Sequence, residues 1–204
     1  EMQAGRSNAL HGVHMSNSSN VTIGIQSSAL GNVIAGQGGH GIYVERVSYE
    51  EPDSDCAGLK IQNNWVGHYE DIAWPNAGDG VLLYAINGGV IGGTNQLEGN
   101  HIGANGGAGI GAARCSGLTI QNNDIGVWFT LSGPVPMGNL DGIRADALVS
   151  SLIGGGGAYE RNYVAHNQRD GVRVEYETGN CISNRIQGNL IGTDSTGMDA
   201  APNG

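Results

Sequence analysis

Two short patterns of apolar, polar and small residues recur along the whole chain. The first, Asn-x-[Ile/Val]-[Gly/Ala], begins at Asn32, Asn64, Asn100, Asn123, Asn162 and Asn189. The second, Gly-[Ile/Val]-x-[hydrophobic], begins at Gly12, Gly41, Gly80, Gly109, Gly142 and Gly171. From each asparagine to the next such glycine, with Gly204 taken as the last, the spacing is 9, 16, 9, 19, 9 and 15 residues. Because short and long gaps alternate strictly, the sequence indicates a repeat built from pairs of related units.

The glycine pattern has the two-residue period of a β-strand, so its apolar positions should form two inward-facing columns. The first column would contain Val13, Ile42, Val81, Ile110, Ile143 and Val172. The second would contain Met15, Val44, Leu83, Ala112, Ala145 and Val174. A third strand is expected between the two patterns, as in Leu59-Lys60-Ile61 and Leu118-Thr119-Ile120. The pattern therefore predicts coils of three strands each.

Strand-bearing repeats of about thirty residues are typical of solenoids. We predict an all-β fold, a right-handed parallel β-helix of about six coils in a single domain, residues 1–204. The two-coil repeats would span approximately residues 11–78, 79–140 and 141–204. The long gaps predict loops at 46–57, 68–78, 92–99, 127–140 and 193–203. All five prolines fall in these loops and none in an expected strand, as a parallel hydrogen-bond ladder requires.

Three residue types are expected to serve the coil geometry. The repeated asparagines should stack into a ladder of side-chain amides where the chain turns a corner. The glycine that opens each repeated strand should supply a positive φ or a close backbone approach. Cys56, Cys115 and Cys181 occupy one repeat position two coils apart. That spacing is about 10 Å, too far for a disulfide, so these cysteines are predicted to be packed thiols.

Composition and charge limit the kinds of partner that the chain could bind. Glycine accounts for 37 residues, and the net charge is −10 with Lys60 as the single lysine. Such a surface argues against nucleic acid and against an anionic membrane. No apolar run approaches the length of a membrane-spanning helix, so membrane insertion is not expected. An acidic, lysine-poor chain is typical of extracellular or cell-surface proteins.

The repeats resemble those of the right-handed parallel β-helix proteins of the pectin-lyase-like superfamily. The stretch from Gly188 to Gly197 is similar to a repeat of large bacterial secreted and surface proteins. The superfamily includes polysaccharide lyases, glycoside hydrolases, uronan epimerases and phage tailspikes, so the resemblance implies the fold and leaves the activity open. Gly39-His40-Gly41 resembles the Gly-His-Gly of polygalacturonases, but the aspartates that precede that histidine and the Arg-Ile-Lys of that family are absent.

One candidate catalytic face lies on the last two glycine-pattern strands. Its residues are Asp141, Arg144, Asp146, Asp170, Arg173 and Glu175. Carboxylates and guanidinium groups side by side could bind a uronate, and a lyase needs both a neutralising cation and a base. The alternative is a surface ladder of mutually compensating charges.

Two further groups could bind ligands. Glu51, Asp53 and Asp55 could coordinate Ca²⁺, the only cofactor that the sequence suggests, although a solvated acidic loop has the same composition. Trp65, Tyr163 and Trp128 could stack on sugar rings, or they could cover the solenoid or contact another chain.

The leading hypothesis is a structural role, as a segment of a filament, adhesin or surface stalk, because the repeats stay regular and no acid–base constellation stands out. A polysaccharide lyase, hydrolase or epimerase acting on acidic glycans and a non-catalytic glycan-binding module are the alternatives. Asn203-Gly204 repeats Asp79-Gly80 and Asp141-Gly142 at steps of 62 residues. The sequence therefore predicts that the solenoid continues, into flanking repeats or into further copies stacked end to end.

Overall fold

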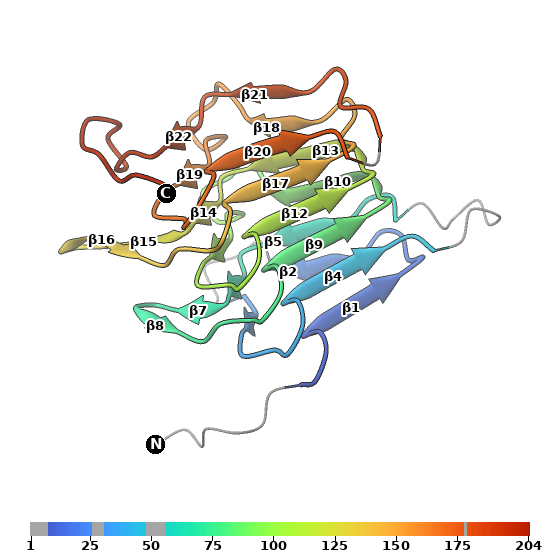
Figure 1. The fold of residues 1–204 in the computed structure, drawn as a ribbon, viewed down its shortest axis with the longest axis horizontal. Helices are drawn as coiled ribbons and strands as arrows, with labels where there is room; N and C mark the ends of the chain where they lie inside the picture. The colour runs from blue at the N-terminus through green and yellow to red at the C-terminus, as the bar shows by residue number, and fades with distance from the viewer. Residues whose placement is uncertain (1–7, 26–30, 48–55, 178) are drawn as a thin grey trace.

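The computed structural model describes residues 8–25, 31–47, 56–177 and 179–204. Three parallel six-stranded sheets run along the molecule and form a β-solenoid of about six turns (Figure 1). Sheet A contains β1 (Val13–Ser16), β4 (Ile42–Glu45), β9 (Val81–Tyr84), β12 (Ile110–Ala113), β17 (Ile143–Asp146) and β20 (Val172–Glu175). Sheet B contains β2 (Thr22–Gly24), β5 (Lys60–Gln62), β10 (Asn87–Gly92), β13 (Ser116–Gln121), β18 (Leu152–Gly154) and β21 (Arg185–Gln187).

Sheet C closes each coil with strands of two residues. They are β3 (Val33–Ile34), β6 (Trp65–Val66), β11 (His101–Ile102), β14 (Asp124–Ile125), β19 (Tyr163–Val164) and β22 (Leu190–Ile191). Each coil thus takes one strand from each sheet, with β1, β2 and β3 in coil one and β20, β21 and β22 in coil six. The prediction of an all-β parallel solenoid with three strands per coil is confirmed.

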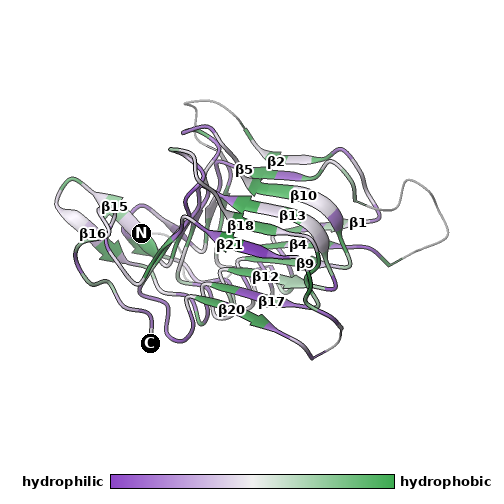
Figure 2. Ribbon diagram, turned by 90° about the horizontal axis from the view of Figure 1, so that it is seen from above, coloured by the Kyte–Doolittle hydropathy of each residue, from purple (hydrophilic) through white to green (hydrophobic). Residues whose placement is uncertain are grey.

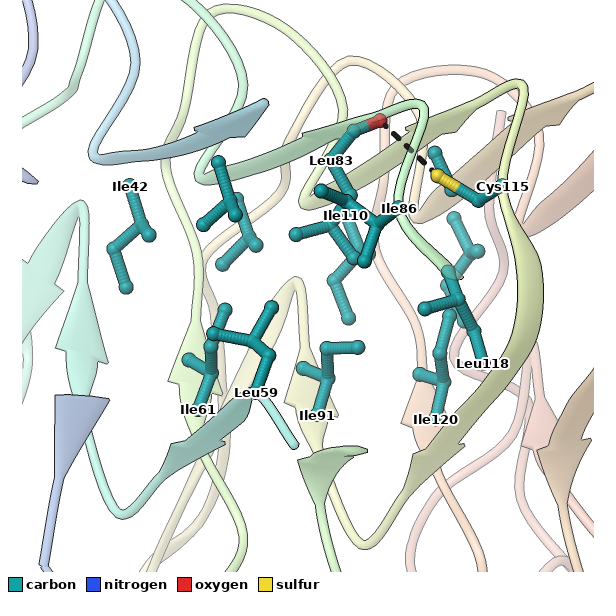
Figure 3. Packing of buried hydrophobic residues seen from close by; sticks show 14 of the residues in the cluster. Ile42, Leu59, Ile61, Leu83, Ile86, Ile91, Ile110, Cys115, Leu118 and Ile120 are labelled. Atoms are coloured by element: carbon teal, nitrogen blue, oxygen red, sulfur yellow. Dashed lines mark hydrogen bonds between the residues drawn. The ribbon is translucent and has the colours of Figure 1, made fainter. Parts of the chain in front are cut away.

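The apolar columns pair as the sequence predicts. Ile110 lies between Val81 and Ile143 in the first column, and Ala112 lies between Leu83 and Ala145 in the second. The inward side chains of coils two to five are fully or almost fully buried and form one continuous core (Figure 3). Hydrophobic residues accordingly concentrate on the stacked strands in Figure 2.

The cysteines are free thiols, as predicted. Cys115 and Cys181 lie two coils apart, because Ser116 pairs with Val149 and Val149 pairs with Ile182. The Cys115 Sγ donates to the carbonyl of Leu83 at 3.5 Å (Figure 3), and burial raises the pKa of this thiol to about 11. Cys115 is therefore a packed thiol with little thiolate at neutral pH, and Cys56 and Cys181 also pack against the core.

The predicted asparagine ladder is present and spans all six coils. Each Asn donates from Nδ2 to Oδ1 of its neighbour in the next coil, over distances of 2.8–3.0 Å. A second ladder, which the sequence analysis missed, lies after sheet C. Its members are Asn76, Asn105, Asn139, Asn167 and Asn203, joined at 2.8–3.1 Å. Both corners that flank sheet C are therefore closed by stacked amides.

The opening glycines act through close approach rather than through positive φ. A Cβ on Gly80 would lie 2.7 Å from Asn105 Nδ2 and 2.8 Å from the carbonyl of Gly109. The positive φ values fall instead on glycines such as Gly126, at 81°. There a Cβ would lie 2.3 Å from the carbonyl of Ala165. Of the two roles predicted for the opening glycines, positive φ or a close backbone approach, the structure shows the close approach.

Two of the predicted loops form antiparallel hairpins that project from sheet C (Figure 1). β7 (His68–Tyr69) pairs with β8 (Ile72–Ala73), and β15 (Val127–Thr130) pairs with β16 (Gly133–Pro136). The rule that every proline lies outside the strands was wrong here, because Pro134 and Pro136 are part of β16. A two-stranded hairpin has an open edge on which a proline leaves no ladder bond unmade.

The two ends of the solenoid differ in how far their inward-facing side chains are exposed. In coil one, Met15, Ile23 and Ile34 are buried, at 6–8% exposure. In coil six, the inward-facing Val174, Ile186 and Ile191 are exposed, at 36%, 47% and 41%, whereas Val172 and Cys181 are partly buried against the core. Coil one therefore has a covered core and coil six has an open one.

The prediction that Asn203-Gly204 opens a further repeated strand was also wrong. Asn203 stacks on Asn167, and the Gly204 amide donates to the Asn167 carbonyl at 2.9 Å. Because Asn167 lies four residues before Gly171, Gly204 occupies the position of Gln168 and not that of an opening glycine. The spacing of 62 residues between Asp141-Gly142 and Asn203-Gly204 therefore does not reflect equivalent positions in the coil.

Candidate functional site

The outer face of sheet A carries two outward side chains per coil, and coil four leaves a hollow there. Its outward residues are Gly111 and Ala113, whereas the neighbouring strands carry Leu82 on one side and Arg144 on the other. The hollow has a volume of about 260 Å³ and is also lined by Asp146, Glu175 and Glu177. Small residues on one coil therefore open a polar depression in an otherwise continuous surface.

Asp79 lies next to Gly111 and Arg144, two of the residues that line the hollow, although the sequence analysis did not select it. The residue is 3% exposed, and its Oδ1 accepts from the Ala108 amide at 2.7 Å. Its Oδ2 lies 3.5 Å from Arg144 Nη2, and a Cβ on Gly111 would come within 2.4 Å of it. Burial raises the pKa of Asp79, and Arg144 opposes that rise. A partly desolvated acid next to a guanidinium group is an arrangement suited to general acid–base chemistry.

The six predicted catalytic residues do not converge on one point. Arg144 pairs with Arg173 and Asp146 pairs with Glu175 across neighbouring strands, as predicted. However, Arg173 is engaged within its own strand, with its Nη2 at 2.6 Å from Glu175 Oε2.

Asp141 and Asp170 lie at the corner before the strand. Asp141 is fully buried, its Oδ1 accepts from the Asp170 amide at 3.3 Å, and its Oδ2 has no hydrogen-bond partner among the described residues. Asp141 is therefore inaccessible to a polymeric substrate. The sequence did contain a signal for Asp79. Like the predicted residues Asp141 and Asp170, Asp79 directly precedes an opening glycine.

The histidine of Gly39-His40-Gly41 belongs to that same row of corner residues. The His40 amide donates to His11 Nδ1 at 3.1 Å, and the Asp79 amide donates to His40 Nδ1 at 2.8 Å. The His11 and His40 rings stack with centroids 5.1 Å apart. Burial is the main cause that lowers the pKa of both rings. These contacts indicate that His40 joins neighbouring coils at the corner before sheet A, which is a structural role.

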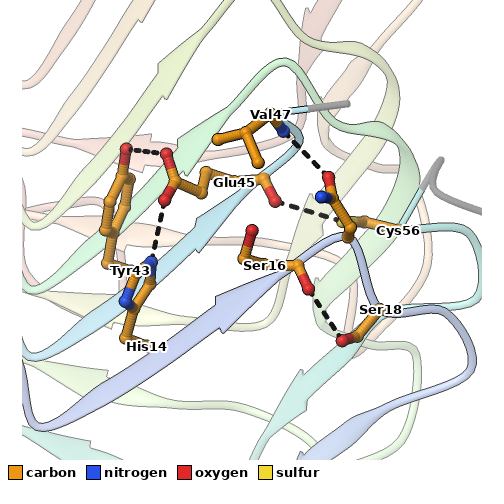
Figure 4. Close-up of polar contacts among 8 residues, drawn as sticks. His14, Ser16, Ser18, Tyr43, Glu45, Val47 and Cys56 are labelled. Carbon is orange, nitrogen blue, oxygen red and sulfur yellow. Dashed lines mark hydrogen bonds and ion pairs between the residues drawn. The ribbon is translucent and has the colours of Figure 1, made fainter. Parts of the chain in front are cut away.

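A polar cluster covers the same sheet face at coils one and two (Figure 4). Glu45 accepts from the Tyr43 hydroxyl at 2.7 Å and lies 2.9 Å from His14 Nε2. The Tyr43 bond lowers the pKa of Glu45, while burial and Glu45 raise the pKa of Tyr43 to about 12. Tyr43 is thus a neutral hydroxyl donor at ordinary pH.

Of the predicted binding aromatics, Trp65 and Tyr163 lie on sheet C and Trp128 lies on β15 of the second hairpin. Trp65 is 6% exposed, so it has no free face for a ligand. Tyr163 packs against Phe129, with ring centroids 5.2 Å apart. Trp128 lines a cleft of about 440 Å³ between the hairpins, together with Glu70 and Asp71. Of the three predicted rings, Trp128 alone lines this cleft.

The predicted calcium ligands Glu51, Asp53 and Asp55 lie outside the described residues. Within residues 8–25, 31–47, 56–177 and 179–204, no group of three or more His, Cys, Asp or Glu side chains is placed to hold a metal ion. The same part of the chain contains no helix with the length and apolar character needed to cross a membrane.

Comparison of the chain with protein-family models, with curated proteins and with solved structures gives no match. The fold and the site geometry are therefore the basis for the functional proposal.

Proposed function

We propose that this chain is a structural segment of an extracellular β-solenoid, of the kind found in filaments, adhesins and surface stalks, and that a further coil packs on coil six. The observation that supports this is the open core of coil six, where Ile186 and Ile191 are exposed at positions that are buried in the coils before it. Solenoid coils are stabilised by their neighbours, so an uncovered apolar coil gains stability from another coil.

The chemistry of the two ladders specifies what fits there. Inside the solenoid, each coil donates from its corner asparagines to the Asn Oδ1 atoms of the following coil, as Asn162 does to Asn189 and Asn167 does to Asn203. A following parallel coil with asparagine at both corners would accept the equivalent bonds from coil six. The burial of Met15, Ile23 and Ile34 in coil one favours a flanking repeat over the first coil of a second copy as this partner.

The test is an extended chain in which a second copy of residues 141–204 follows Gly204. This junction preserves the ladder spacing, because Gly204 would then precede Asp141 as Leu140 does. We expect the extended chain to melt at a higher temperature than the parent chain. Ile186→Asp should destabilise the extended chain far more than the parent chain, since the residue becomes buried only in the former. An equal cost in both chains would refute the proposal.

Polysaccharide cleavage is the second candidate, favoured by the Asp79–Arg144 pair beside the hollow on sheet A. A lyase acting there would release unsaturated uronate ends that absorb ultraviolet light. Asp79→Asn and Arg144→Ala should each abolish that absorbance. If no uronate polymer gives an unsaturated product with the parent chain, uronate lyase activity is eliminated.

A further inference from the structure

The cleft between the two hairpins has the composition of a sugar-binding site. Its walls are Glu70 and Asp71, from the turn between β7 and β8, and Trp128, Thr130, Ser132 and Val135, from the second hairpin. The two hairpins belong to coils two and four, so the solenoid spaces them along its length (Figure 1). The cleft lies on the side of sheet C, away from the hollow on sheet A.

The Trp128 ring is fixed in place from behind. Its centroid lies 4.6 Å from that of Trp65 and 4.8 Å from that of His101, both in edge-to-face arrangements. The His101 Nδ1 lies 2.9 Å from Asp124 Oδ2, and Trp65 packs on His101 at 4.3 Å. Because these contacts immobilise the ring before any ligand arrives, binding would cost little side-chain entropy.

The β15–β16 hairpin is itself anchored to the solenoid. Val127 is buried against Ala165 and Ala201, and Phe129 and Tyr163 pack on the same cluster. The tip of this hairpin presents Leu131, which is fully exposed. One wall of the cleft is therefore anchored, and it presents the Trp128 ring and Val135 together with the hydroxyls of Thr130 and Ser132.

The opposite wall is acidic. Glu70 and Asp71 are exposed and form no ion pair with another described residue. The Glu70 carbonyl lies 2.9 Å from His68 Nδ1, and Glu70 has a φ of 52°, so a tight turn fixes where the two carboxylates stand. Carboxylate oxygens accept hydrogen bonds from hydroxyl groups, and no arginine or lysine lines the cleft.

We infer that this cleft binds a neutral oligosaccharide. The apolar C–H face of a pyranose ring would pack on Trp128, and neighbouring hydroxyls would donate to Glu70 and Asp71. The two carboxylates would repel uronates and sulfated sugars. This inference is independent of any coil added after coil six and of chemistry on sheet A.

The experiment is a titration of the whole chain with cellohexaose, mannohexaose, laminarihexaose or hexagalacturonate. Binding is measured by calorimetry and by tryptophan fluorescence. We expect at least one neutral hexaose to bind and hexagalacturonate not to bind. Trp128→Ala should weaken binding at least tenfold, Trp128→Phe should weaken it less, and the Glu70→Gln, Asp71→Asn double variant should weaken it severalfold. Tyr159→Ala, which removes an exposed ring outside the cleft, is the matched control and should leave affinity unchanged.

Three results would overturn the inference: no binding of any neutral hexaose, equal affinity of the parent chain and Trp128→Ala, or tighter binding of hexagalacturonate. Tetramethylammonium is included because a cation could also sit between Trp128 and the carboxylates. Its binding without that of any sugar would identify the cleft as a cation site instead. Thermal melting of Trp128→Ala and Trp128→Phe at the parent temperature verifies that loss of binding is not loss of folding.

Discussion

At the scale of single residues, asparagine is the side chain that joins one coil to the next. Asn123 Nδ2 donates to Asn162 Oδ1 at 2.9 Å and to the Ile91 carbonyl at 3.0 Å, one bond to each neighbouring coil. Its Oδ1 accepts from both the amide and the Nδ2 of Asn100. An aspartate has the same shape but no donors, so it could not continue this chain of bonds.

Asn123→Ala is expected to lower the free energy of unfolding by about 2–4 kcal/mol, because it leaves several buried polar groups without partners. Denaturant unfolding followed by circular dichroism measures this cost. Asn87→Ala is the control, since Asn87 is exposed and its Oδ1 accepts one bond, from Ser116. Similar losses in the two variants would contradict the role assigned to the ladder.

His68 gives the first hairpin a dependence on pH. The ring is fully buried, its Nδ1 contacts the Glu70 carbonyl, and its Nε2 has no partner among the described residues. Burial lowers the pKa of His68 to about 4, from 6.5. Since the unfolded chain takes up this proton first, the contribution of His68 to stability is complete above pH 6.5. It is lost progressively as the pH falls to about 4.

The expected loss is about 3 kcal/mol over that interval. His68→Gln should reduce the pH dependence by this amount, whereas His14→Gln, which changes an exposed ring, should reduce it far less. Unfolding curves at pH 7, 5.5 and 4 give the comparison. A wild-type pH profile in His68→Gln would show that the ring is not held neutral by burial.

At the scale of elements, burial depends on the coil to which a strand belongs and not on the strand's own sequence. β17 and β20 have the same alternation and pair residue for residue, with Ile143 opposite Val172 and Ala145 opposite Val174. Ile143 and Ala145 are fully buried, while Val174 is exposed. The neighbouring coil on each side is what makes an inward position a core position.

Ile143→Ala should therefore cost about 2–5 kcal/mol of stability, and Ile186→Ala less than about 1 kcal/mol in the chain as it stands. Chemical denaturation of both variants tests the difference. A large cost at Ile186 would mean that coil six is covered in solution by another molecule. Light scattering would reveal that molecule as an increase in mass.

At the scale of the whole molecule, the solenoid has one covered end and one open end. Because the strands of each coil form backbone hydrogen bonds only with those of neighbouring coils, stability should fall towards the open end. Hydrogen exchange is expected to be fastest for the amides of β20, β21 and β22 and slowest for those of coils three and four. Uniform protection along the chain would contradict this gradient, and slow exchange in coil six would indicate self-association.

The sequence alone determined the repeat, the inward columns and the first asparagine ladder. These follow from local alternation and from a spacing that every coil copies, as the pairing of Ile110 with Val81 and Ile143 demonstrates. Only the tertiary structure decided what lies outside the repeat. The second ladder was hidden because Asn76 and Asn139 follow insertions of different length. Asp79 contacts Arg144 two coils away, and Trp128 lines one cleft with Glu70 from another hairpin. The cleft depends on the paths of the insertions, which have no period of their own in the sequence.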